Sequence, residues 1–210
     1  MNPSFFQEDD ERAVRHFTAL LAENGVDARS LDWGSRASQT LRFRVLAQVA
    51  NLQGATVLDV GCGLGDLFDW LNSQRTVVDY TGIDITPDMV DAASHRFPKG
   101  KFHVNNLLQE NGELARSYDF VLASGIFYFR QVKTYDFLQE MVTAMFKRCS
   151  RAVAFNSLSS WAPGQDANEF YADPAQVLAI CKELSPWVVL RHDYHARDLT
   201  VYMYREKPLA

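Results

Sequence analysis

The 210-residue sequence predicts an α/β fold built on a mostly parallel sheet. From Ala55 onward, short apolar runs alternate with helical stretches, which is the pattern of βαβ units. The last two apolar runs are joined only by Tyr194 to Asp198, which is too short for a parallel crossover and predicts an antiparallel hairpin. With 47% apolar and 22% charged residues, the composition is that of an ordinary globular protein.

The first 53 residues are predicted to form a helical cap. Apolar residues recur at helical spacing from Val14 to Leu21, and Gly25 is placed to end this helix. A second helix is predicted from Ser35 to Asn51. Because no repeat or long linker is present, the chain is predicted to be one domain, with residues 1–53 as the cap and residues 54–210 as the core.

Seven segments of the core are rich in apolar and β-branched residues and are predicted to be strands. They are Thr56 to Val60, Val78 to Ile83, Lys101 to Val104, Phe120 to Ala123, Arg151 to Phe155, Val188 to Asp193 and Leu199 to Tyr204. Helices are predicted between them, starting after the glycine turn that follows the first strand, after Thr86, at Thr134 and near Pro174.

Charge and cysteine content narrow the classes of partner. The net charge of -5 argues against a large nucleic-acid interface, because such interfaces rely on cationic contacts to phosphates. The three cysteines lie far apart and show no zinc-binding spacing, so no metal site is predicted. The acidic N-terminus does not resemble a signal peptide, and no apolar run is long enough to span a membrane. We therefore expect a cytoplasmic protein without a membrane partner.

A glycine-rich loop follows the first predicted strand. In the segment Val57 to Asp66, glycines occupy positions 61, 63 and 65, and glycine permits sharp turns and close approach to a ligand. Dinucleotide-binding loops have the spacing GxGxxG, whereas Asp66 stands at the sixth position here. A carboxylate at the start of the next helix disfavours a pyrophosphate and suits a cationic or ribosyl ligand. Asp84 directly follows the second predicted strand and can accept hydrogen bonds from both ribose hydroxyl groups.

The segment VLDVGCGLGDL resembles the first motif of the class I S-adenosylmethionine-dependent methyltransferases, and the resemblance is strong from Thr56 to Ala123. It implies a Rossmann-like methyltransferase fold, with sheet order 3-2-1-4-5-7-6, an antiparallel last strand and helices on both faces. The implied cofactor is S-adenosylmethionine. Asp84 would bind its ribose, Ile85 would pack on its adenine, and Asn106 would stand where the family usually has an acidic adenine ligand. The other residues implied to contact the cofactor are Asp59, Gly61, Cys62, Gly63, Gly65, Leu107 and Ser124.

Some of the predicted site residues also have purely structural interpretations. The alternative role for Asp84 is that of a helix cap, and the alternative role for Asn106 is that of a turn residue. Cys62 is interpreted as a loop residue without a nucleophilic role. Gln39 or Arg42 is a candidate for the carboxylate of the methionine group, and the alternative for Arg42 is an exposed helix charge.

The acceptor is predicted to lie beyond the carboxyl ends of the strands. Tyr128, His192 and His195 are the candidate catalytic helpers there, and for each histidine the alternative is a structural role. Aromatic residues of the loops after the fourth and fifth strands are predicted to wall a partly apolar acceptor. They are Phe127, Tyr128, Phe129, Trp161, Phe170 and Tyr171.

The sequence thus predicts an enzyme that transfers a methyl group by in-line displacement to oxygen or nitrogen of a small metabolite. RNA or protein acceptors are alternatives within the same chemistry. A non-catalytic module that binds the cofactor is the alternative of another class. The oligomeric state is left open by the sequence.

Overall fold

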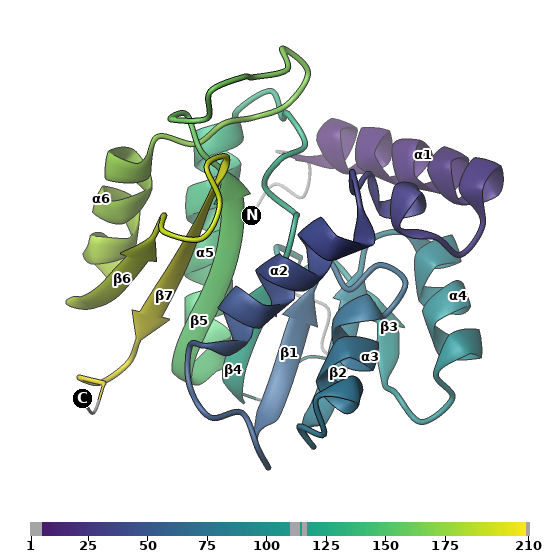
Figure 1. The fold of residues 1–210 in the computed structure, drawn as a ribbon, viewed down its shortest axis with the longest axis horizontal. Coiled ribbons are helices and arrows are strands. Elements are labelled where there is room, and N and C mark those ends of the chain that lie inside the picture. The colour runs from purple at the N-terminus through teal and green to yellow at the C-terminus, as the bar shows by residue number, and fades with distance from the viewer. Residues whose placement is uncertain (1–5, 110–113, 115–116, 209–210) are drawn as a thin grey trace.

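The sheet has the predicted strand order. In the computed structural model, which describes residues 6–109, 114 and 117–208, seven strands are arranged β3-β2-β1-β4-β5-β7-β6 (Figure 1). The strands are β1 (Thr56–Val60), β2 (Asp79–Asp84), β3 (Phe102–Val104), β4 (Tyr118–Ala123), β5 (Cys149–Leu158), β6 (Trp187–Arg191) and β7 (Asp198–Tyr204). The Rossmann-like methyltransferase fold is confirmed.

Strand β7 is the antiparallel member. It pairs antiparallel with both β5 and β6, whereas β1 pairs parallel with β2 and β4. Strand β5 is longer than the predicted Arg151 to Phe155, because its pairing with β7 continues to Leu158 opposite Asp198. This extension carries the start of β7 to the sheet edge at which the parallel strands end.

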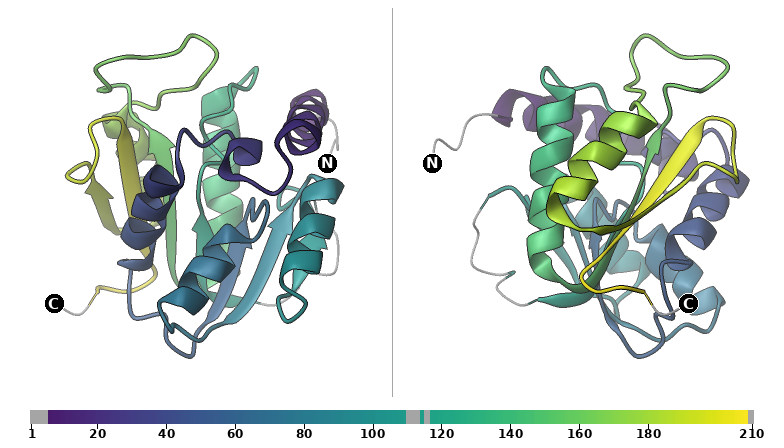
Figure 2. Two further views of the ribbon diagram at one scale, coloured as in Figure 1. Left: turned by 45° about the vertical axis from the view of Figure 1, so that its right-hand side comes forward. Right: turned by 90° about the vertical axis from the view of Figure 1, so that its left-hand side faces the viewer.

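Helices cover both faces of the sheet (Figure 2). One apolar core lies beneath α2 (Arg36–Ala47), α3 (Asp66–Ser73) and α4 (Pro87–Arg96). The other lies beneath α5 (Thr134–Arg148) and α6 (Pro174–Leu184). Among the described residues, no helix has both the length and the apolar character needed to cross a bilayer.

The N-terminal segment lies over the carboxyl ends of the parallel strands (Figure 1). It comprises α1 (Gln7–Asn24) and a 3-10 turn, η1 (Ala28–Leu31), which was not predicted. Helix α2 begins after Ser35, whose hydroxyl oxygen accepts a hydrogen bond from the backbone N–H of Ser38. It ends at Ala47, four residues before the predicted end, because the chain turns there toward β1.

Candidate functional site

A cavity lies between the N-terminal segment and the carboxyl ends of β1, β2, β3 and β4. Most of the residues predicted to contact the cofactor line it. Of these it contains Gln39, Asp59, Gly61, Cys62, Gly63, Asp84, Ile85, Asn106, Leu107 and Ser124. Gly65 and Arg42 do not line it. Gly65 is instead the residue before α3, in the left-handed conformation with φ 77°.

The glycine loop requires glycine because of its backbone and its neighbours. Gly61 and Gly63 have φ values of 74° and 50°, which side chains disfavour. A Cβ atom on Gly63 would lie 2.6 Å from Leu31 Cδ2, and one on Gly61 would clash with Ile126. The loop is thereby closely covered by η1 and by the segment after β4.

Asp84 connects the glycine loop with Thr86, the residue before α4, through two hydrogen bonds. One carboxylate oxygen accepts the backbone N–H of Gly63 at 2.9 Å, and the other accepts that of Thr86 at 2.9 Å. Burial is the largest influence on Asp84 and raises its pKa. Asp84 is not a cap of α4, because Thr86 is the residue before the helix and none of the described N–H groups of the first turn is bonded to Asp84. Its carboxylate lines the cavity.

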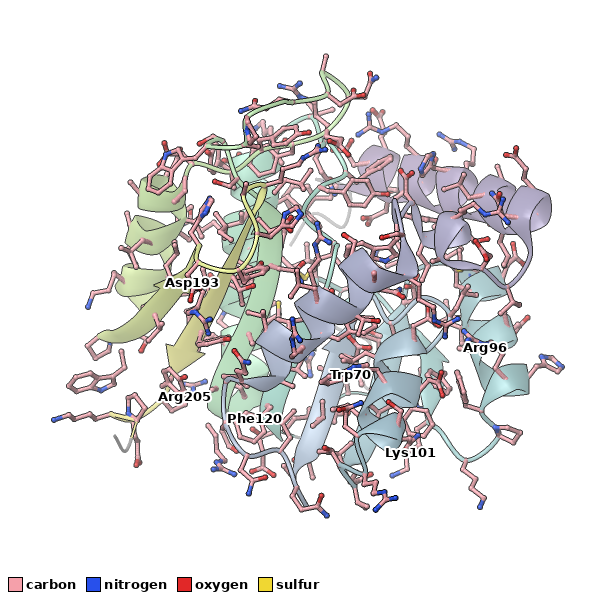
Figure 3. All side chains as sticks on the ribbon, in the orientation of Figure 1. Trp70, Arg96, Lys101, Phe120, Asp193 and Arg205 are labelled. Atoms are coloured by element: carbon pink, nitrogen blue, oxygen red, sulfur yellow. The ribbon has the colours of Figure 1, made fainter. Side chains whose placement is uncertain are left out.

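Two further carboxylates line the same cavity. Asp59 is buried and accepts a hydrogen bond from the Tyr80 hydroxyl at 2.6 Å. Burial raises the pKa of Asp59 to about 7, with smaller contributions from Asp84 and Asp66. Asp66 is held by Gln39, at 3.1 Å, and by Arg96, at 2.9 Å, whose side chain reaches over from the end of α4 (Figure 3). The cavity therefore favours a ligand with cationic or hydroxyl groups.

Replacing Asp59 with asparagine is expected to raise the free energy of unfolding by about 4 kcal/mol at pH 8 and to change it little at pH 4. The folded protein keeps the proton on Asp59 up to about pH 7, whereas the ordinary pKa of an exposed aspartate is 3.8. The wild-type protein therefore loses stability as the pH rises between these values, and asparagine avoids that loss. Urea denaturation of both proteins from pH 4 to pH 9 measures the difference. Parallel pH profiles would contradict this prediction.

Asn106, which stands where the family usually has an acidic adenine ligand, has both ends of its amide bonded within the protein. Its amide oxygen accepts the backbone N–H of Leu108 at 2.9 Å, as a turn residue does. Its amide nitrogen donates to Oδ2 of Asp10, on α1, at 2.7 Å. The acidic group at this end of the cavity is thus Asp10, which belongs to the N-terminal segment.

A second cavity adjoins the first, with which it shares Leu31, Trp33, Gly125 and Tyr128. Arg42 lies on its wall, and not beside the glycine loop as predicted. The guanidinium of Arg42 donates to Oδ1 of Asp198 at 2.7 Å, and Trp33 stacks 4.8 Å from it. With side chains 9% and 1% exposed, Arg42 and Asp198 form a buried ion pair. This pair replaces the predicted contact to a carboxylate of the cofactor.

His195 also lies on the wall of the second cavity. Its Nδ1 atom is 2.8 Å from Oδ2 of Asp198 and accepts a hydrogen bond from the backbone N–H of Arg197 at 3.2 Å. Oδ2 of Asp198 is buried and receives no aligned hydrogen bond within the described part of the chain. Arg42 Nη2 also lies 2.7 Å from this oxygen. When Nδ1 carries a proton toward Asp198, in place of accepting from Arg197, Nε2 is unprotonated and can act as an acceptor.

The other two candidate helpers are placed differently. Tyr128 lies where the two cavities meet, and its hydroxyl donates to Asp32 at 3.1 Å. Burial and the Asp32 carboxylate raise the pKa of Tyr128, so the phenol is a hydrogen-bond donor and not a base. His192 is outside both cavities. Its Nε2 atom lies 2.7 Å from Ser159 Oγ, and its ring stacks on Trp161, which gives it the structural role.

The predicted aromatic wall is wrong for the second cavity. Phe127 and Phe170 are buried in the apolar core, and Trp161 is 63% exposed. Of the six aromatic residues, only Tyr128 lines the second cavity, and Phe129 lines the first. Charged and polar side chains take their place: Asp32, Ser35, Ser38, Arg42, Asn156, Ser157, Glu169, His195, Arg197 and Asp198.

The sequence did not identify the contribution of α1 to the site. Asp10, Ala13 and Phe17 line the first cavity, at a spacing that places them on one helix face. This spacing could have indicated a helix face that lines a ligand cavity, but the same spacing is found in a helix packed on an apolar core. Asp198 was not predicted as a site residue, although His195 lies only three positions before it. Its other partner, Arg42, is 156 positions away and reaches it only in the folded chain.

The side chains that line the first cavity fit a positively charged nucleoside. Carboxylates at Asp59, Asp66 and Asp84 suit an ammonium group and ribose hydroxyls, and Ile85 and Leu107 supply apolar contact for a base. Ile126 and Leu31 occupy the space that side chains on Gly61 and Gly63 would need, so their segments pack directly on the backbone of the glycine loop.

Comparison with known sequences gives consistent matches. A methyltransferase domain model matches residues 58–158. A Mycobacterium tuberculosis protein assigned as a methyltransferase is 32% identical over 154 residues, covering 70% of this chain and 90% of that protein. The magnesium-protoporphyrin O-methyltransferase of Rhodobacter capsulatus is 28% identical over 153 residues, which cover 70% of this chain and 64% of that enzyme. The ubiquinone biosynthesis O-methyltransferase of Pasteurella multocida is 28% identical over 145 residues, and the match spans 69% of this chain but only 48% of that enzyme.

Solved structures share the fold. The magnesium protoporphyrin IX methyltransferase of Synechocystis, with bound S-adenosylhomocysteine, has a TM-score of 0.65 at 16% identity, over 94% of this chain and 96% of that one. An O-methyltransferase family protein from Burkholderia thailandensis has a TM-score of 0.67 at 15% identity, over 98% of this chain and 70% of that one. The relative from Mycobacterium tuberculosis, at 32% identity over 90% of its length, shows the methyltransferase family, and the solved structures share the fold. The chain therefore belongs to the class I S-adenosylmethionine-dependent methyltransferases.

Proposed function

We propose that the protein methylates a hydroxyl oxygen of a small polar molecule seated in the second cavity, with His195 as the general base. The observation that carries the proposal is the placement of His195, backed by the buried Asp198, on a polar cavity that adjoins the cofactor cavity. Two relatives are named as O-methyltransferases of small molecules, which supports oxygen as the acceptor atom.

The cofactor supplies an electrophilic methyl group when it is bound. Trp33 and Tyr128 stand between the two cavities, so they orient the acceptor against the cofactor and exclude water from the junction. As the new carbon–oxygen bond forms, the hydroxyl proton moves to Nε2 of His195. Asp198 then stabilises the resulting imidazolium, in a geometry made rigid by Arg42.

The proposed function is tested by mass spectrometry of small-molecule products. The purified protein is incubated with S-adenosylmethionine and a panel of small alcohols, phenols, carboxylic acids and amines, with bulk tRNA and a protein extract in parallel. We expect methyl transfer to an oxygen of a small molecule, with little change between low and moderate salt. Methylation found only on nitrogen, or only on tRNA with a steep loss as salt rises, would refute the acceptor assignment.

A further inference from the structure

Helix α1 brings a carboxylate into the cofactor cavity at the end where β3 stops. Asp10 lines that cavity beside Ala13 and Phe17, so α1 presents one acidic group within an otherwise apolar stripe. Burial is the main influence on Asp10 and raises its pKa to about 6. Asp9, its neighbour on the helix, faces away and accepts hydrogen bonds from Arg12 and from the backbone N–H of Val132.

Asn106 holds Asp10 in a fixed orientation. The amide oxygen of Asn106 faces the N–H of Leu108, so the nitrogen must face Asp10, and a flipped amide would place an oxygen against the carboxylate. This bond occupies Oδ2 of Asp10. Within the part of the chain that the structure describes, Oδ1 of Asp10 has no hydrogen-bond donor. A partly buried carboxylate oxygen is thus left to accept a bond from a ligand in the cavity.

The position of Asp10 in the first cavity indicates which part of the cofactor would contact its carboxylate. Ile85 and Leu107, which line the cavity at the ends of β2 and β3, are the apolar residues expected to contact the adenine. Asn106 immediately precedes Leu107 and is bonded to Asp10, so the Asp10 carboxylate lies beside this apolar pair. An adenine edge offers one donor there that an acceptor-only group recognises, its exocyclic amino group.

We propose that Asp10, positioned by Asn106, accepts a hydrogen bond from the exocyclic amino group of the adenine and so selects an adenine nucleoside. The acidic ligand is supplied by α1 and not by the segment after β3. Helix α1 is fixed by Thr18, which donates to Asp88 of α4 at 2.9 Å, and by Asp9, which accepts from Val132 at 3.0 Å. Cofactor binding therefore stabilises the N-terminal segment that also borders the second cavity through Leu31 and Trp33.

The test is a comparison of two nucleoside ligands by calorimetry, without any acceptor. S-adenosylhomocysteine carries the amino group, and S-inosylhomocysteine carries a carbonyl oxygen in its place. We expect the wild-type protein to prefer the adenosyl ligand. Asp10→Asn should lower adenosyl affinity roughly tenfold and leave inosyl affinity equal or higher, because the amide can donate to the carbonyl oxygen. Because burial of Asp10 already disfavours its negative charge, the neutral asparagine side chain is suited to this position. The Asp10→Asn variant is therefore expected to fold.

Glu11→Gln is the matched control, because it removes an exposed carboxylate from the next position of the same helix. It should bind both ligands as the wild-type protein does. An Asp10→Asn variant that keeps the wild-type preference, or that loses both ligands equally, would overturn the proposal. The inference rests on the cofactor of the family and not on the proposed acceptor, so it can fail while the proposed function stands, and the reverse also holds.

Discussion

Replacing His195 with alanine is expected to lower the rate of methyl transfer by about 100- to 10,000-fold, because that is the usual contribution of a positioned general base. Affinity for S-adenosylhomocysteine should stay nearly unchanged, since His195 lies on the second cavity and not on the first.

His192→Ala is the matched control for this prediction. His192 is the other histidine beside the last hairpin, but it is bonded to Ser159 and lies outside both cavities. Its replacement should leave the rate and its pH dependence as in the wild-type protein. A His195→Ala variant with an unchanged rate at every pH would mean that the acceptor reaches the protein already deprotonated or that another group takes the proton. In either case His195 would not be the base.

Local patterns in the sequence were sufficient for the strand order and for the glycine loop. The segment Val57 to Asp66 encodes its own strand, turn and helix start, and the short connection before Asp198 forces the hairpin. The predicted residues that line the first cavity mostly belong to such strand ends. Their side chains are placed by the strand itself, so few long-range contacts are needed to locate them.

The parts that were missed depend on contacts between distant segments. Arg42 meets Asp198, and Asn106 meets Asp10, only after α1 and α2 dock on the sheet. A helical pattern indicates that a face is apolar, but it does not say whether that face covers a core or a ligand. For the same reason the aromatic residues after β4 and β5 were assigned to the acceptor, whereas Phe127 and Phe170 fill the core.

The buried ion pair between Arg42 and Asp198 leads to the second prediction with a large expected effect. Asp198→Ala should lower the free energy of unfolding by about 3–5 kcal/mol, because it leaves the Arg42 guanidinium buried without its carboxylate. Arg42 would keep its bond to the backbone oxygen of Ser38 and its contact with Trp33, neither of which neutralises its charge. Urea denaturation at pH 7 measures this loss.

A double variant separates the structural and the catalytic parts of this pair. Arg42→Met combined with Asp198→Leu replaces both charges with apolar side chains, which often restores stability when a buried pair is removed whole. We expect most of the lost unfolding free energy to return, while methyl transfer stays as low as in Asp198→Ala, since His195 still lacks its carboxylate. Recovery of activity along with stability would contradict this, because Asp198 would then act only by holding α2 on the sheet. The ion pair would in that case be a structural clamp, and the orientation of His195 would come from the backbone of Arg197 alone.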